Sequence, residues 1–233
     1  MNKPNLQQQR GVTLIELMIS LVISSILMLG IVGIYITSKR GYVLQDDLAR
    51  QQENARFSLD VLMHDIRMAG YPKDTFGEPF DEDTTVDGGG TASDTITLKF
   101  ESATDCLNQA TPSNIAINRY FIDDNGNLSC QGNGSDEVEI LAEGVTNMQI
   151  LYGINTDSTD DGQANKYVSW NNVALAERKK IVSIRIGLLT STPSESASAE
   201  ISKDHQVLDQ TITTEEKRIY RTYTNTIVMR NRV

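Results

Sequence analysis

The sequence predicts an α+β protein in which a long N-terminal helix packs on an antiparallel β-sheet domain. Two observations carry this prediction. No proline occurs between Asn5 and Tyr71, and apolar residues in that stretch follow a helical period. The rest of the chain reads as short alternating segments separated by loops. Strands without long helices between them form antiparallel sheets, and 233 residues suit one membrane helix and one globular domain.

The first part of the helix is expected to cross a membrane. Residues 17–38 carry no charge, and about 20 apolar residues suffice to span a bilayer. A secretory signal peptide or a plain signal anchor also begins with a short charged head and an apolar run. This run exceeds the roughly 7–15 residues of a signal peptide, and no clear Ala-x-Ala type cleavage site precedes Lys39.

A single carboxylate, Glu16, stands at the leading end of this apolar segment. A simple anchor would not need it, because an ionisable group within a membrane is unfavourable and is a functional-site hypothesis by default. Its expected partner is a cation at the same depth. Cleavage after Gly11 would create one, the α-amino group of Val12.

The second part of the helix is expected to be amphipathic and to pack on a folded domain. Gly70-Tyr71-Pro72 is a natural helix stop. A helix over residues 12–69 would be about 90 Å long. The apolar residues on its helical period are Leu44, Leu48, Ala55, Leu59, Leu62, Ile66 and Ala69.

The chain after Pro72 is expected to form strands and loops. The sequence Asp123-Asp124-Asn125-Gly126 predicts a hairpin turn. Residues 75–93 and 190–199 are expected to be loops because they are rich in turn-forming and polar residues. The predicted strands are residues 95–100, 119–122, 128–130, 137–141, 147–152, 181–189 and 218–230.

Residues 11–17 (GVTLIEL) closely resemble the class III signal of type IV prepilins and pseudopilins. The resemblance implies that a prepilin peptidase cleaves after Gly11 on the cytoplasmic side and methylates Val12. It also implies that Glu16 pairs with the N-terminal amine of a neighbouring subunit. The first mature residue is usually Phe in this family and is Val here.

The same resemblance divides the chain into four parts. Residues 1–11 are the leader peptide, and residues 12–38 are the transmembrane or filament-core helix. Residues 39–70 continue this helix as an amphipathic segment, and residues 71–233 form a β-rich periplasmic domain.

Three further segments resemble the PilW family of minor pilins: residues 45–71, the stretch from Leu151 to the Asp-rich turn and Tyr167, and residues 220–227. This implies a structural subunit that primes type IV pilus assembly, with a tip position. It would be a single-pass inner-membrane protein before assembly and part of the cell-surface pilus afterwards. The implied partners are other minor pilins, the major pilin, the prepilin peptidase and the inner-membrane assembly machinery.

Two alternatives stay open. A minor pseudopilin of a type II secretion system would have the same start and a similar β-domain. A membrane-anchored periplasmic binding protein or adhesin would use the helix only as an anchor and the β-domain for a ligand.

The two cysteines, Cys106 and Cys130, are expected to form a disulfide in a domain that faces the periplasm. A redox Cys-x-x-Cys pair is absent. The distant histidines, His64 and His205, do not complete a zinc set.

Composition and motifs argue against several other functions. The formal net charge of −10 becomes −12 without the leader cations Lys3 and Arg10, which disfavours nucleic acid and anionic lipid as partners of the globular part. No nucleophile motif lies near His64 or His205, and no phosphate-binding or dinucleotide signature occurs, so neither an enzyme nor a cofactor is expected.

One acidic loop leaves Ca²⁺ binding open. Asp157, Thr159 and Asp161 occupy the first, third and fifth positions of an EF-hand-like loop. The twelfth position is Val168, which supplies no carboxylate. Acidic loops of this kind are commonly plain turns.

Overall fold

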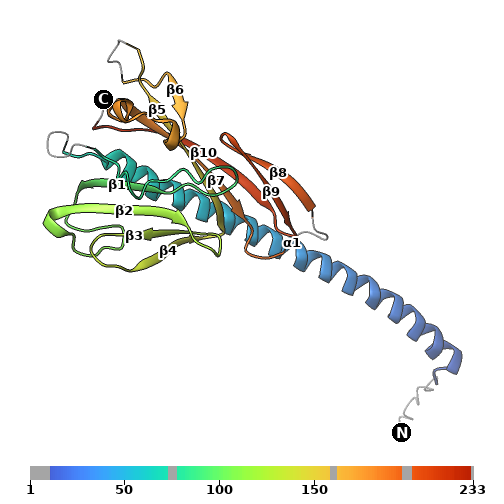
Figure 1. Cartoon of the computed structure of the whole chain (residues 1–233). Coiled ribbons are helices and arrows are strands. Elements are labelled where there is room, and N and C mark those ends of the chain that lie inside the picture. The colour runs from blue at the N-terminus through green and yellow to red at the C-terminus, as the bar shows by residue number, and fades with distance from the viewer. Residues whose placement is uncertain (1–10, 73–77, 158–161, 196–200, 232–233) are drawn as a thin grey trace, which may run out of the picture. The chain divides into compact units, whose positions relative to one another are not determined.

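The computed structural model describes residues 11–72, 78–157, 162–195 and 201–231 (Figure 1). It contains one long helix, ten strands and three short 3₁₀ helices within these ranges. The chain forms two compact units, residues 1–46 and residues 47–233, and each is described by itself. The 3₁₀ helices are Pro112–Asn114, Trp170–Asn172 and Leu175–Lys180.

Helix α1 extends over Leu14–Met68, which confirms the long N-terminal helix. Within the second unit it buries a stripe with the expected helical spacing. The stripe is more polar than predicted, because Gln51 and Ser58 are buried while Leu59 is only half-buried. Its buried residues are Asp47, Gln51, Ala55, Ser58, Leu62, Asp65 and Ile66.

The helix ends where Gly70-Tyr71-Pro72 predicted. Gly70 adopts a positive φ of 77°, a conformation that glycine takes at helix C-termini without strain. The side-chain amide of Asn231 donates to the carbonyls of Arg67, Met68 and Ala69 at 3.3, 3.1 and 3.2 Å. A residue from the far end of the chain therefore caps the last turn of α1.

The strands form antiparallel sheets, as predicted, but they divide into three sheets. The first has the order β1-β2-β3-β4, the second β10-β7-β5-β6, and β8 and β9 form a separate hairpin. The strands of the first sheet are β1 (Ile96–Glu101), β2 (Ile115–Ile122), β3 (Asn127–Gln131) and β4 (Val138–Glu143). The others are β5 (Val145–Ile154), β6 (Lys166–Val168), β7 (Ile181–Ser191), β8 (Ile201–Val207), β9 (Gln210–Glu216) and β10 (Tyr220–Val228).

The predicted hairpin turn after β2 is confirmed. Ile122 pairs with Leu128 across β2 and β3, and Gly126 has a φ of 73°. The carboxylate of Asp123 accepts hydrogen bonds from the backbone N–H groups of Asn125 and Asn127, both at 2.9 Å. This is the local bonding that makes Asp a turn residue.

The two loop predictions were only partly right, and two strands were missed. The predicted loop 190–199 begins inside β7, which continues to Ser191. Strands β8 and β9 were missed because their sequences are mostly polar; Val207 and Ile212 bury apolar surface there against Leu189. Phe80 lies in the predicted surface loop 75–93 but is 1% exposed, and it bridges Leu98 of β1.

The core of the second unit lies between α1 and the first two sheets. Phe80, Tyr152 and Trp170 form an aromatic cluster with ring centroids 5.0–5.5 Å apart. The largest fully buried side chains around it include Leu62, Ile66, Ile96, Leu98, Tyr120, Leu128, Met148, Ile150, Ile154 and Ile181.

The segment before β1 joins the two four-stranded sheets through both backbone and side-chain hydrogen bonds. The N–H of Asp94 donates to the carbonyl of Met148 at 2.8 Å, and its carboxylate accepts the N–H of Ile150 at 2.7 Å. The side-chain amide of Gln149 donates to the carbonyl of Ala92 at 2.8 Å. These bonds satisfy part of the β5 edge that the short strand β6 does not reach.

Burial raises the pKa of Asp94 to about 6. The N–H groups of Gly88 and Ile150 favour the ionised form, and the nearby carboxylates of Asp87 and Asp209 oppose it. The folded protein thus binds a proton at Asp94 that the unfolded chain releases at a pKa near 3.9. Between about pH 4 and pH 6, this group makes stability fall as the pH rises.

We expect the Asp94→Asn variant to lose this pH dependence. In the wild type, the contribution of Asp94 to the free energy of unfolding should fall by about 2–3 kcal/mol between pH 4 and pH 7. The measurement is urea unfolding of the full chain in detergent at several pH values. Other carboxylates titrate in both proteins, so the two proteins are compared by the slope of the free energy of unfolding against pH. Parallel curves for the wild type and Asp94→Asn would contradict the prediction.

Candidate assembly site

The N-terminal unit presents Gly11, Val12 and Thr13 immediately before the first turn of α1. The N–H and the hydroxyl of Thr13 both donate to Oε2 of Glu16 at 3.0 Å. The N–H of Glu16 lies 3.3 Å from the Thr13 hydroxyl oxygen, which accepts it. Thr13 and Glu16 therefore form a capping box, in which two otherwise unpaired N–H groups of the helix start are satisfied.

The capping box gives Glu16 a local role that we did not predict. The spacing Thr-x-x-Glu before an apolar run is the sequence signal for it, and Thr13 is the functional residue that was overlooked. Both hydrogen bonds from Thr13 to the carboxylate use Oε2. Oε1 remains as the acceptor that a cation from outside this unit could approach.

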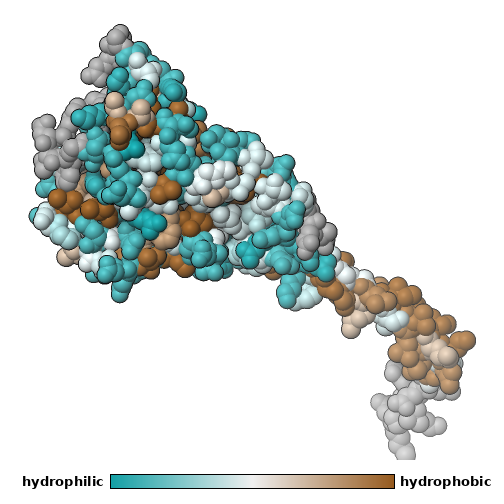
Figure 2. Space-filling view, viewed as in Figure 1, coloured by the Kyte–Doolittle hydropathy of each residue, from teal (hydrophilic) through white to brown (hydrophobic). Residues whose placement is uncertain are grey.

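The helix from Leu17 to Ser38 carries no charge and is exposed within its unit, and the face of it seen in Figure 2 is mostly hydrophobic. The most apolar stretch of 18 residues in this helix has a mean hydropathy of 2.6, and none of its residues is buried. Hydroxyl groups inside the segment bond to the helix itself: Ser20 to the Glu16 carbonyl at 2.7 Å and Thr37 to the Gly33 carbonyl at 3.0 Å. The segment can thus enter an apolar environment without exposing these hydroxyls.

The other end of α1 is fixed to the β-domain by a buried carboxylate, Asp65, which is 6% exposed. Its Oδ2 atom accepts hydrogen bonds from the amide of Asn118 at 2.7 Å and the hydroxyl of Tyr120 at 2.5 Å. Burial, and next the negative charge of Asp65, raise the pKa of Tyr120 well above its usual value. The Tyr120 hydroxyl therefore stays protonated and donates to Asp65.

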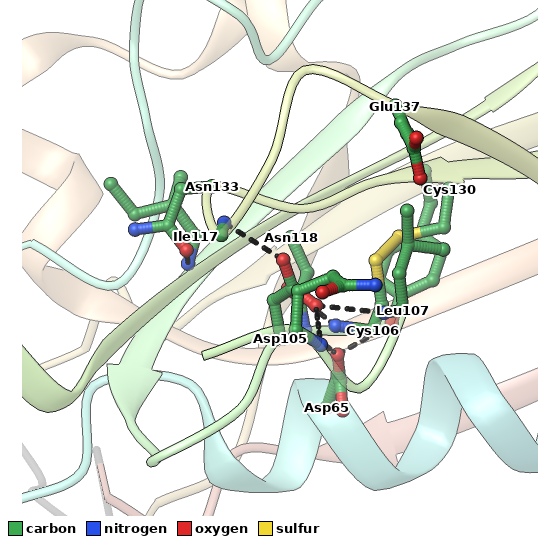
Figure 3. The surroundings of a disulfide bond; sticks show 12 residues. Asp65, Asp105, Cys106, Leu107, Ile117, Asn118, Cys130, Asn133 and Glu137 are labelled. Carbon is green, nitrogen blue, oxygen red and sulfur yellow. Dashed lines mark hydrogen bonds between the residues drawn. A yellow bond between two sulfur atoms is a disulfide. The ribbon is translucent and has the colours of Figure 1, made fainter. Parts of the chain in front are cut away.

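The disulfide between Cys106 and Cys130 is confirmed, with Cα atoms 6.6 Å apart (Figure 3). The N–H of Cys106 donates to the Asn118 side-chain oxygen at 3.0 Å, so the amide of Asn118 connects the disulfide loop to Asp65 on α1. Asp105 closes the same loop by accepting the N–H groups of Leu107, Gln109 and Gly134. Closing a loop of 24 residues contributes roughly 3 kcal/mol in the chain-entropy model.

The Ca²⁺ alternative lies mostly outside the described residues. Thr159 and Asp161 fall in the undescribed range 158–161, and Asp157 accepts a hydrogen bond from the amide of Asn165 at 2.5 Å. Among the residues that the structure does describe, no group of three or more His, Cys, Asp or Glu side chains could hold a metal ion.

Neither histidine is part of a catalytic arrangement in the described chain. His64 lies on α1 with Nδ1 3.0 Å from Asp65. His205 lies buried in β8, where its ring packs against Tyr220 and Nε2 lies 3.2 Å from the Thr214 hydroxyl. Burial, followed by the charge of Lys203, lowers the pKa of His205.

These features define a class: a pilin-like protein with a prepilin-type start, a long helix and a disulfide-bonded β-domain. The family model described as prokaryotic N-terminal methylation motif matches residues 6–32. The model described as Type IV Pilus-assembly protein W (PilW) matches residues 119–231. These two matches support a type IV pilus minor pilin of the PilW family.

One solved structure has a similar fold, and a second gives a weaker alignment. The type IV-like pilin TTHA1219 from Thermus thermophilus aligns with a TM-score of 0.51 at 11% identity, over 78% of this chain and 97% of that chain. A chain of the GspK-GspI-GspJ complex from the type 2 secretion system of enterotoxigenic Escherichia coli aligns with a TM-score of 0.38 at 14% identity, over 74% of this chain and 96% of that one. No curated protein matches the sequence.

Proposed function

We propose that this minor pilin helps to initiate assembly of a type IV pilus, in a tip or priming complex with other minor pilins. The observation that carries the proposal is the arrangement of the N-terminal unit. A carboxylate with a helix-capping partner stands between a Gly11–Val12 bond and an exposed apolar helix. Capping the helix is a use that a plain anchor would share, so the proposal depends on the place of this carboxylate beside the Gly11–Val12 bond.

Before assembly, residues 12–38 would hold the chain in the inner membrane, with residues 71–233 in the periplasm. Prepilin peptidase would cleave between Gly11 and Val12 and methylate the new amine of Val12. The resulting cation lies four residues before Glu16 in the sequence, so each subunit would carry both partners of an intersubunit ion pair.

During assembly, helices of neighbouring subunits would replace lipid around residues 17–38. Glu16 would then meet the Val12 amine of a neighbour in an apolar surrounding, where an unpaired charge is expensive. A buried polar pair of this kind sets the axial register of packed helices, as a buried Asn does in coiled coils. The capping bonds from Thr13 would hold the carboxylate in place for this pairing.

The test begins with the intact mass of the protein purified from its native membrane. We expect a chain that starts at Val12 and carries one methyl group, together with a disulfide. A chain that still begins at Met1 would contradict the processing and favour a plain anchor. The second measurement compares pilus number and type II secretion in a deletion strain: loss of pili with normal secretion supports the proposal, and the reverse result overturns it.

A further inference from the structure

The second sheet ends at strand β10, and no described strand pairs with its outer edge (Figure 1). On its inner side, β10 pairs with β7 along its full length, from Tyr220 opposite Ser191 to Val228 opposite Ser183, without a register shift. Residues 222–228 contain neither a charge nor a proline. An edge that is long, regular and uncharged readily pairs with a further strand.

The hydrogen-bond pattern shows which residues face the open edge. The N–H of Met229 donates to the Val182 carbonyl at 2.9 Å, and the N–H of Thr192 donates to the Ile219 carbonyl at 3.0 Å. The odd-numbered residues therefore bond to β7, because bonding alternates along an antiparallel pair. The even-numbered residues direct their N–H and C=O groups to the open edge, and they have exposed side chains: Thr222, Thr224, Thr226 and Val228.

The other edges of the four-stranded sheets are protected. The outer side of β1 is occupied by the preceding segment, since Lys99 donates to the Pro79 carbonyl at 2.8 Å and Asp81 donates to the Thr97 carbonyl at 3.1 Å. Strand β4 is short, irregular against β3 and carries Glu139 and Glu143. Strand β6 has three residues. Short, irregular or charged edges resist strand addition.

A groove beside the end of β10 adds an indication of what binds there. Helix α1 runs alongside β10, because the amide of Asn225 lies 3.9 Å from the Met63 sulfur and Asn231 caps the helix end. Within the described chain neither Arg67 nor Arg230 has an acidic partner within salt-bridge distance. The groove is lined by Asp60, Met63, His64, Arg67, Met68 and Arg230.

We propose that β10 accepts an extended strand from another subunit, with an acidic side chain placed against Arg67 and Arg230. The uncharged edge supplies backbone hydrogen bonds, and the groove supplies Met63 and Met68 as apolar contacts and the two guanidinium groups as cations, while its one carboxylate, Asp60, lies about two helix turns from Arg67. A second copy of β10 is a poor occupant, because Tyr220–Val228 contains no acidic side chain to place against Arg67 and Arg230. The identity of the partner as a subunit rests on the proposed function, whereas strand binding can be measured without it.

The experiment uses the full chain in detergent and synthetic peptides of about eight alternating Thr and Val residues. One peptide ends in two Asp residues and its control ends in two Lys residues. The protein variant is Thr224→Pro, which removes a donor from the open edge but none from the bonds to β7, and Thr224→Val is its matched control. Unfolding temperatures show whether each variant is folded.

We expect the acidic peptide to bind at least roughly tenfold more tightly than the Lys peptide, and Thr224→Pro to weaken binding by a similar factor while Thr224→Val does not. Methylating the backbone nitrogens of the peptide should abolish binding, and this arm needs no protein variant. Equal binding to Thr224→Pro, or to the methylated peptide, would overturn strand addition. Equal binding of the Lys peptide would overturn the acidic partner, and a Thr224-dependent homodimer would overturn the heterotypic one.

Discussion

Replacing Asp65 by Ala should lower the free energy of unfolding of the β-domain by about 3–5 kcal/mol. The substitution would leave the hydroxyl of Tyr120 and the amide of Asn118 without their acceptor, and these residues are only 1% and 2% exposed. Buried donors without a partner retain their full desolvation penalty. The loss should also loosen the disulfide loop, because Asn118 holds the N–H of Cys106.

Urea unfolding of the full chain in detergent can measure this, with the fluorescence of Trp170 as the signal. Trp170 is the single tryptophan and lies in the core of the β-domain. Asp60→Ala is the matched control on the same helix, since Asp60 is exposed and faces Arg56 at 3.8 Å, and its effect should stay below about 1 kcal/mol.

A double variant separates the buried donors from a general disturbance of the helix. Adding Tyr120→Phe to Asp65→Ala removes one donor that has lost its acceptor, so we expect it to recover part of the stability. The role assigned to Asp65 would be wrong if Asp60→Ala and Asp65→Ala lowered the free energy of unfolding equally. It would also be wrong if the double variant were no more stable than Asp65→Ala.

Asp65 also illustrates what the sequence could and could not predict. The period of apolar residues along α1 identified the helix and its end, because that information is local. The buried polar residues on the same face were not identified, because their partners lie far away in the sequence. Gln51 donates to carbonyls of Thr190 and Ile219, and Asp65 accepts from residues 118 and 120.

The division of the strands into separate sheets could not be predicted for a similar reason. Glu143 ends β4 and Val145 begins β5, yet these strands belong to different sheets. The single residue between them, Gly144, has a φ of 72°, which turns the chain from one sheet into the next. Alternation along a strand indicates that it has a buried face, but it does not indicate which strand lies beside it.

The candidate site could be proposed from the sequence because its residues are neighbours in the chain. Gly11, Val12 and Glu16 lie within one turn and a half of each other, and Thr13 completes a local capping box. The roles proposed for cleavage and subunit pairing still await a test. The capping box makes that test more demanding, because it offers a second explanation for Glu16.

The Glu16→Ala variant should be inserted, cleaved and methylated normally but should fail to enter the pilin complex. Without the carboxylate, the methylated amine of a neighbouring Val12 would be buried in the helix core without a counter-ion, which destabilises packing by about 3–5 kcal/mol. We expect recovery of the variant with partner pilins to fall by at least roughly a hundredfold in co-purification from the membrane.

Thr13→Val distinguishes assembly from helix capping. It removes the hydroxyl that bonds to Glu16 but keeps the carboxylate, so its effect should be limited to the loss of a cap, about 1 kcal/mol. If Glu16 acts only as a capping residue, both variants should reduce recruitment to a similar, small extent. If it pairs with a neighbouring amine, Glu16→Ala should abolish recruitment while Thr13→Val largely preserves it. Normal co-purification of Glu16→Ala would therefore remove the ion pair from the assembly mechanism and leave the capping box as the role of this carboxylate.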